Sequence, residues 1–123
     1  FQILKTLEMD NEIGLPLLRT CAKHSKLNEH IEACGIVLNF EPKRFYPLRN
    51  IKNSANFFEL DSRVNLIRDK IFCIFHSHPL ASAYPSDLDM SYSRSIGIPY
   101  LVYSVLYDNF IYFDLKKCIP IKV

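Results

Sequence analysis

The chain has 123 residues, of which 49% are hydrophobic, and a formal net charge of +2 with a sequence pI near 8.4. This length predicts one domain over residues 1–123, with enough apolar side chains to fill a core. The charge is too small to indicate nucleic-acid binding, no apolar stretch approaches a membrane span, and no signal peptide is visible.

The order of predicted elements is α/β. Apolar, β-prone runs predict strands at residues 2–8, 31–39, 43–48, 57–60, 71–77, 101–106 and 110–115. Amphipathic spacing and capping residues predict helices at 15–27, after a cap at Asp61 or Ser62, and at 86–96, closed by Gly97. We expect hairpins from 31–39 to 43–48 and, turning at Asp108-Asn109, between the last two strands. The fold class that follows is a mixed β-sheet with flanking helices.

The segment H-S-H-P-L-A-S-A-Y-P-S-D-L-D carries the most informative chemistry in the chain. His76 and His78 end an apolar strand and, being two residues apart, project from the same face. Ser86 stands at a helix start, and Asp89 falls in the first turn, from which its carboxylate can reach both histidines. Two imidazoles and one carboxylate suffice for a catalytic zinc with an open position for water. The alternative to a metal site is that the histidines end a strand at a solvent-exposed edge, while Ser86 and Asp89 merely cap a helix. Capping explains Ser86 but not the histidine pair.

This arrangement resembles the JAMM motif of the MPN family of zinc metallopeptidases. Glu32, in the run E-A-C-G-I-V-L, is similar to the E-x-C-G-hydrophobic signature of that family. The resemblance extends from about residue 10 to the end, and its closest form looks like the prokaryotic JAB-type domain of phage tail assembly protein K. It implies the cytidine-deaminase-like MPN fold and one Zn²⁺ per chain, held by His76, His78 and Asp89.

The resemblance also implies the roles of two catalytic residues. Glu32 is expected to act as the base that takes a proton from the metal-bound water, which then attacks a carbonyl carbon. Ser86 is expected to donate a hydrogen bond to the oxyanion of the tetrahedral intermediate. Ser86 is equally suited to act as a helix N-cap, and the two roles are compatible in different states.

Other histidines and the cysteines are expected to have structural roles. His24 and His30 are interpreted as surface residues rather than ligands. The four cysteines have no C-x-x-C spacing and are interpreted as packed, reduced thiols of an intracellular protein, Cys34 included.

The expected function is hydrolysis of a peptide or isopeptide bond by a zinc metallopeptidase. The substrate is expected to be a protein or peptide, with phage tail proteins or a ubiquitin-like modifier as the partners that the resemblance implies. The expected location is the cytoplasm of a bacterium or phage-infected host, or the virion tail. The resemblance also implies that tail proteins of this kind often carry a second, cysteine-peptidase domain. The alternative is a non-catalytic MPN-fold assembly module that binds a protein partner. A nucleobase deaminase is disfavoured because the H-x-E and P-C-x-x-C signature is absent.

Overall fold

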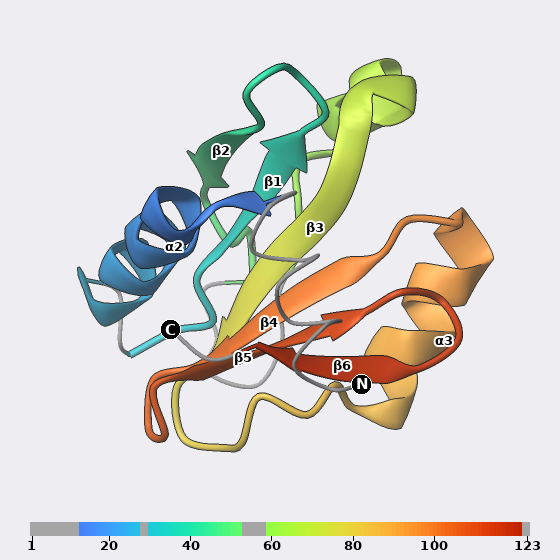
Figure 1. Ribbon diagram of the computed structural model, residues 1–123. Coiled ribbons are helices and arrows are strands. Elements are labelled where there is room, and N and C mark those ends of the chain that lie inside the picture. The colour runs from blue at the N-terminus through green and yellow to red at the C-terminus, as the bar shows by residue number, and fades with distance from the viewer. Residues whose placement is uncertain (1–12, 28–29, 53–58, 122–123) are drawn as a thin grey trace.

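The computed structural model describes residues 13–27, 30–52 and 59–121, and the account below concerns those residues. A six-stranded mixed sheet forms the centre of the molecule, with helices on both of its faces (Figure 1). The strands are β1 (Cys34–Leu38), β2 (Arg44–Leu48), β3 (Ile71–His78), β4 (Tyr100–Ser104), β5 (Asn109–Phe113) and β6 (Cys118–Ile121). The helices are α2 (Leu15–Leu27), the 3₁₀ segment η1 (Ser62–Lys70) and α3 (Asp87–Ile96).

The strand order β2-β1-β3-β4-β5-β6 places β3 in the interior of the sheet. Only the β3–β4 pair is parallel, and the chain crosses between these two strands through α3. The other neighbouring pairs are antiparallel. Since ligand sites in such folds gather beyond the carboxyl ends of parallel strands, the carboxyl end of β3 is the first place to look for a site.

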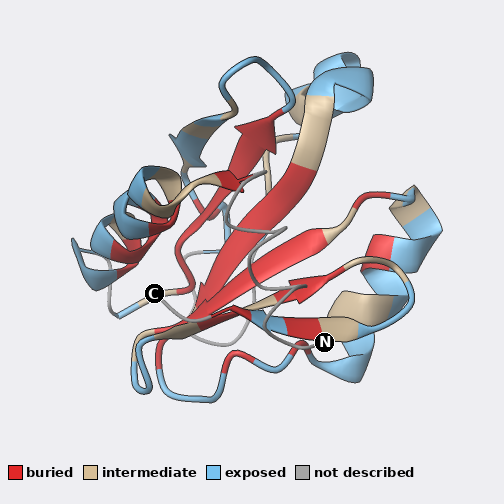
Figure 2. Cartoon of the chain, viewed as in Figure 1, coloured by how far each residue is buried: buried red, intermediate tan, exposed pale blue. Residues whose placement is uncertain are grey.

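Two hydrophobic clusters cover the two faces of the sheet. Figure 2 shows that buried residues run along the central strands. On one face, α2 contributes Leu18 and Cys21, which pack with Phe75 of β3. On the other face, Met90 and Ile96 of α3 pack against a cluster that includes Ile74 of β3. Alternate residues of β3 therefore serve opposite faces, as a doubly covered strand requires.

Gly35 allows β1 and β2 to approach closely. A Cβ atom at Gly35 would lie 2.5 Å from the carbonyl oxygen of Tyr46 and 2.6 Å from the ring of Phe45. Any larger side chain therefore has to displace the backbone of β2. Both edge strands contain a proline, Pro47 in β2 and Pro120 in β6, and an edge is where proline is tolerated in a sheet.

The predicted fold class is confirmed, and most predicted elements are present with shorter bounds. Helix 15–27 is confirmed to its ends, whereas the strand predicted at 31–39 begins only at Cys34. The strand at 2–8 and residues 57–58 lie outside the described residues. Residues 59–60 form no strand, so that part of the prediction was wrong. The hairpin predicted at Asp108-Asn109 joins β4 to β5 and turns over residues 105–108, and Asn109 already belongs to β5.

Candidate metal centre

The two predicted histidine ligands lie at the carboxyl end of β3, on the face that α3 covers. His76 is fully buried and pairs in register with Cys34 of β1 and Val102 of β4. Ring contacts join His76 to Tyr100, with centroids 5.4 Å apart, and to His78, at 5.1 Å. A hydrogen bond fixes the orientation of the His78 ring: its Nδ1 donates to the carbonyl oxygen of Ser82 at 2.7 Å. This contact directs Nε2 of His78 toward α3.

Asp89 reaches the histidines from the first turn of α3. Its Oδ2 lies 3.2 Å from Nε2 of His76 and 3.4 Å from Nε2 of His78. The same oxygen accepts the backbone N–H of Ser86 at 2.9 Å, while the Ser86 hydroxyl accepts the backbone N–H of Asp89 at 3.0 Å. This reciprocal capping box fixes both the start of the helix and the position of the carboxylate.

Glu32 joins the cluster from the chain just before β1. The backbone N–H of Ser77 donates to the carbonyl oxygen of Ala33 at 2.8 Å, so the β1–β3 pairing continues one step beyond the strand. The next step along this register puts Glu32 opposite His78, on the same face. The Glu32 side chain is 5% exposed, and ligand atoms of Glu32, His76 and His78 all lie within 4.8 Å of one another.

The donor set fits a zinc ion. Two ligand atoms that each lie about 2.0–2.1 Å from a tetrahedral zinc are about 3.3–3.4 Å apart. The separations of 3.2 and 3.4 Å between Asp89 Oδ2 and the two imidazole Nε2 atoms match this spacing. Two nitrogens and one carboxylate oxygen are a ligand set of catalytic zinc sites, and the Glu32 carboxyl stands beside them as a further oxygen.

The pKa shifts of the cluster follow from burial and from mutual contact. Burial raises the pKa of the Glu32 carboxyl to about 7, with the charge of His78 opposing this rise and that of Asp89 adding to it. Burial lowers the pKa of His76, against the hydrogen bond to Asp89. Burial alone would lower the pKa of His78, but its contacts with Asp89 and Ser82 raise it.

The carboxyl group of Asp89 has the opposite balance. Burial would raise its pKa, yet the contacts with His76 and His78 hold that pKa well below the usual range. Asp89 is therefore ionised and His76 neutral near pH 7, which are the protonation states that metal ligands need.

Ser86 occupies the N-cap of α3, with its hydroxyl oxygen accepting from Asp89, so the capping role is present in the structure. Its side chain is exposed beside the cluster, and a hydroxyl that accepts a hydrogen bond can still donate its own proton.

His24, His30 and Cys34 are not part of the candidate ligand set, although Cys34 lies opposite His76 in the sheet. His24 is half-buried, so its predicted position at the surface was wrong. Its Nε2 lies 3.3 Å from the carbonyl oxygen of Cys34. His30 is exposed. Cys34 is buried, and burial raises the pKa of its thiol to about 12, so the thiol is protonated at neutral pH, as expected of a packed cysteine.

Sequence reasoning missed the residues that hold the site from behind. Ser82 was not noticed because its carbonyl, not its side chain, makes the contact. Ser77 lies between the two histidines and on the opposite face of the strand, so the histidine pattern does not mark it, and Asn50 has no motif around it. Both turn out to bond to the backbone next to Glu32.

Comparison with known proteins agrees with this geometry. Residues 15–113 match the model of a family described as prokaryotic homologues of the JAB domain. The match covers most of the chain, so the chain belongs to this family. The JAMM/MPN resemblance of the sequence is thereby confirmed at the level of the JAB/MPN domain.

Curated relatives and a solved structure extend the comparison. CysO-cysteine peptidases of Mycobacterium tuberculosis and Mycobacterium bovis are 29% identical over 104 residues, covering 75% of this chain and 71% of the relative. A solution structure of a protein from Desulfitobacterium hafniense has a TM-score of 0.59 and 22% identity, with 83% of each chain covered, and supports the fold alone. The family, the relatives and the candidate metal-binding residues together identify the chain as an enzyme, a homologue of JAMM-type metallopeptidases.

No helix among the described residues is both long and apolar enough to span a bilayer.

Proposed function

We propose that this chain is a zinc-dependent peptidase or isopeptidase that binds one Zn²⁺ through His76, His78 and Asp89. The observation that carries the proposal is the spacing of these donors. Their contacts of 3.2 and 3.4 Å match a zinc ligand set, in a chain that belongs to the prokaryotic JAB family.

Each residue of the cluster has a role in amide hydrolysis. A bound zinc would supply a Lewis acid that polarises the scissile carbonyl and acidifies a water molecule. Glu32, buried beside the histidines, takes the proton of the attacking water and returns it to the leaving nitrogen. Ser86, exposed at the N-cap of α3, donates a hydrogen bond from its hydroxyl to the developing oxyanion. The contact with Ser82 keeps the His78 ring in one orientation.

The substrate class is a protein or peptide cut at an amide bond. Support comes from the relatives, which are named as peptidases of CysO-cysteine. A ubiquitin-like modifier, the partner that the resemblance of the sequence implies, is the one that we propose to test first. None of the relatives or structures compared above is named as a phage tail protein, so the expectation of a role in tail assembly receives no support from them.

The metal content of the purified chain tests the proposal directly. Elemental mass spectrometry should find about one zinc per chain in the native protein and in His30→Ala, whose histidine is exposed and outside the cluster. His78→Ala should contain none. The native protein should then cleave CysO-cysteine, the substrate named for the relatives. A chain that holds no zinc even after incubation with zinc is instead a partner-binding module of the same fold.

A further inference from the structure

The segment that carries Glu32 lies outside regular secondary structure. Residues 31–33 precede β1, and their backbone is irregular in the structure. The β1–β3 register reaches Ala33 through the backbone bond from Ser77, and side-chain contacts add to it in holding the backbone that carries Glu32. Two buried polar residues make such contacts, one on each side of the peptide group between Glu32 and Ala33.

Ser77 makes the first contact, from between the two histidines. Its hydroxyl accepts the backbone N–H of Ala33 at 2.8 Å, while its own N–H donates to the carbonyl oxygen of Ala33 at 2.8 Å. Ser77 is fully buried on the face of β3 opposite to the histidine rings. The strand that supplies His76 and His78 therefore also fixes the segment that supplies Glu32.

Asn50 makes the second contact, from the chain after β2. Its side-chain nitrogen donates to the carbonyl oxygen of Glu32 at 3.0 Å. Its side-chain oxygen accepts the backbone N–H groups of Lys52 and Glu59, both at 3.0 Å. The Asn50 side chain is 3% exposed, and a buried amide with these three bonds is fixed in orientation.

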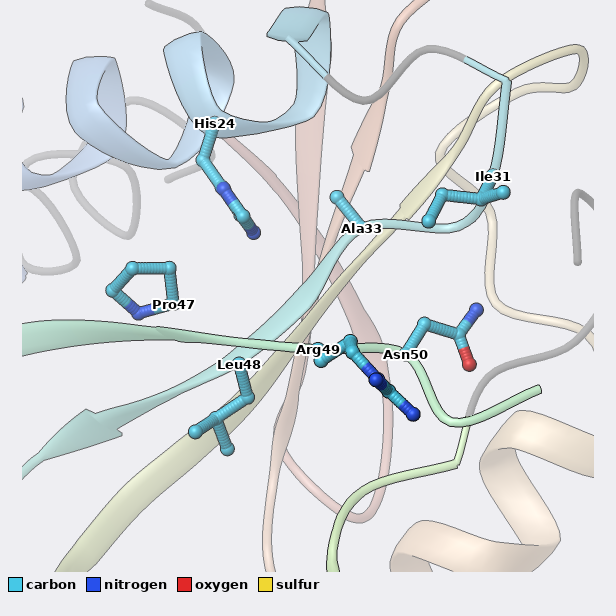
Figure 3. A pocket seen from close by; sticks show the side chains of 7 residues that line it. All are labelled: His24, Ile31, Ala33, Pro47, Leu48, Arg49 and Asn50. Carbon is cyan, nitrogen blue, oxygen red and sulfur yellow. The ribbon is translucent and has the colours of Figure 1, made fainter. Parts of the chain in front are cut away.

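The segment borders a cavity on the side away from the histidine rings, although Glu32 and Ala33 themselves are buried. The cavity has a volume of about 200 Å³, and Ile31, Ala33 and Asn50 are among the residues that line it. Figure 3 shows Asn50 beside the segment that carries Ile31 and Ala33. The hydrogen bonds of Ser77 and Asn50 tie the backbone on the inner side of this cavity to β3 and to the chain after β2.

We infer that Ser77 and Asn50 are positioning residues that together hold the Glu32 carboxyl against the two histidines. The consequence for catalysis rests on the proposed function, because it requires Glu32 to handle the proton of the attacking water. The positioning itself does not, since it concerns the chain alone. Misplacing a catalytic group by about 1 Å can cost on the order of a hundredfold in rate.

The test uses two variants, a rescue and a matched control. Ser77→Ala removes the acceptor for Ala33, and Ser77→Thr restores a hydroxyl. Asn50→Asp keeps both acceptor bonds, which favour its ionised form, and removes the donor to Glu32. Ser25→Ala is the control, because Ser25 is also fully buried and bonds one carbonyl, that of Cys21 within α2.

The first readout needs neither metal nor substrate. Crystal structures of the metal-free variants should show the Glu32 carboxyl displaced by about 1 Å or more in Ser77→Ala and Asn50→Asp. Ser77→Thr and Ser25→Ala should keep the native arrangement. If Ser77→Ala does not fold, Asn50→Asp decides the question. An unmoved Glu32 in a folded Ser77→Ala or Asn50→Asp protein would overturn the inference.

The second readout separates positioning from general stability. In the zinc-loaded enzyme, kcat of Ser77→Ala and Asn50→Asp should fall about ten- to a hundredfold with KM within about twofold and zinc content unchanged. Native kcat in both variants would refute the catalytic consequence. A native chain without zinc or hydrolysis refutes the proposed function instead, while the crystal structures still judge the positioning.

Discussion

Replacing Ser86 separates the two roles that its position allows. The Ser86 hydroxyl accepts the backbone N–H of Asp89 at 3.0 Å and so caps α3. The proposed catalytic role instead uses the hydroxyl proton as a donor to the oxyanion. Ser86→Ala removes both functions, whereas Ser86→Asp keeps an oxygen acceptor for the cap and, when ionised, has no proton to donate.

The expected magnitudes of the two effects differ enough to be told apart. Loss of the N-cap oxygen should lower the free energy of unfolding by about 1 kcal/mol, which for a chain of this length lowers Tm by roughly 3–5 °C. A domain with a stability of about 5–15 kcal/mol remains folded after such a loss. Loss of an oxyanion donor should lower kcat by roughly a hundred- to a thousandfold, far more than a small unfolded fraction could explain.

Thermal unfolding and steady-state kinetics on the same three proteins measure both effects. Ser86→Ala should have a lower Tm and a lower kcat than the native protein. Ser86→Asp should have a Tm near the native value and a kcat as low as that of Ser86→Ala. Zinc content serves as the control, because a new carboxylate beside the cluster could bind the metal. Near-native kcat in Ser86→Ala would refute the catalytic role and leave Ser86 as a helix cap alone.

Three further predictions address the base, the sheet and the thiols. Glu32→Gln should keep about one zinc per chain and lose hydrolysis by at least a hundredfold, so hydrolysis by this variant at the native rate excludes Glu32 as the base. Gly35→Ala should lower the free energy of unfolding by about 1–3 kcal/mol in urea titrations, because its Cβ would meet the carbonyl of Tyr46 at 2.5 Å. At pH 8 the buried thiols should resist a disulfide reagent until the chain is unfolded, since burial raises the pKa of Cys34 to about 12; rapid labelling of Cys34 in the folded protein contradicts this.

The histidine pair and Asp89 could be predicted from the sequence because local rules fix their geometry. A strand ending in His-x-His directs both rings to one face, and a Ser three residues before Asp89 places that carboxylate in the first helical turn. The structure brings all three together as expected. Glu32 is different, since no local rule links it to His78 over such a distance in sequence. Its place depends on the register of β1 against β3, and the prediction relied on the family resemblance.

The elements that the sequence did not predict were decided by tertiary contacts. The strand β6 has only four residues and contains Pro120, which argues against a strand unless the strand lies at an edge. Pairing with β5 provides that edge. The bonds of Asn50 were equally hidden, because a lone Asn after an apolar strand is typical of a turn. The partners of Asn50 are the carbonyl oxygen of Glu32 and the backbone N–H groups of Lys52 and Glu59, which side-chain patterns cannot reveal.

Asp89 links the folding of α3 to the assembly of the metal centre. One oxygen of this residue accepts the N–H of Ser86 in the capping box and also approaches both histidines. The helix N-terminus favours a negative charge at this position, and the two imidazoles lower the pKa of Asp89 further. The carboxylate is therefore ionised and oriented by the fold itself. Under the proposed function, substitution of Asp89 should weaken both the start of α3 and the binding of zinc.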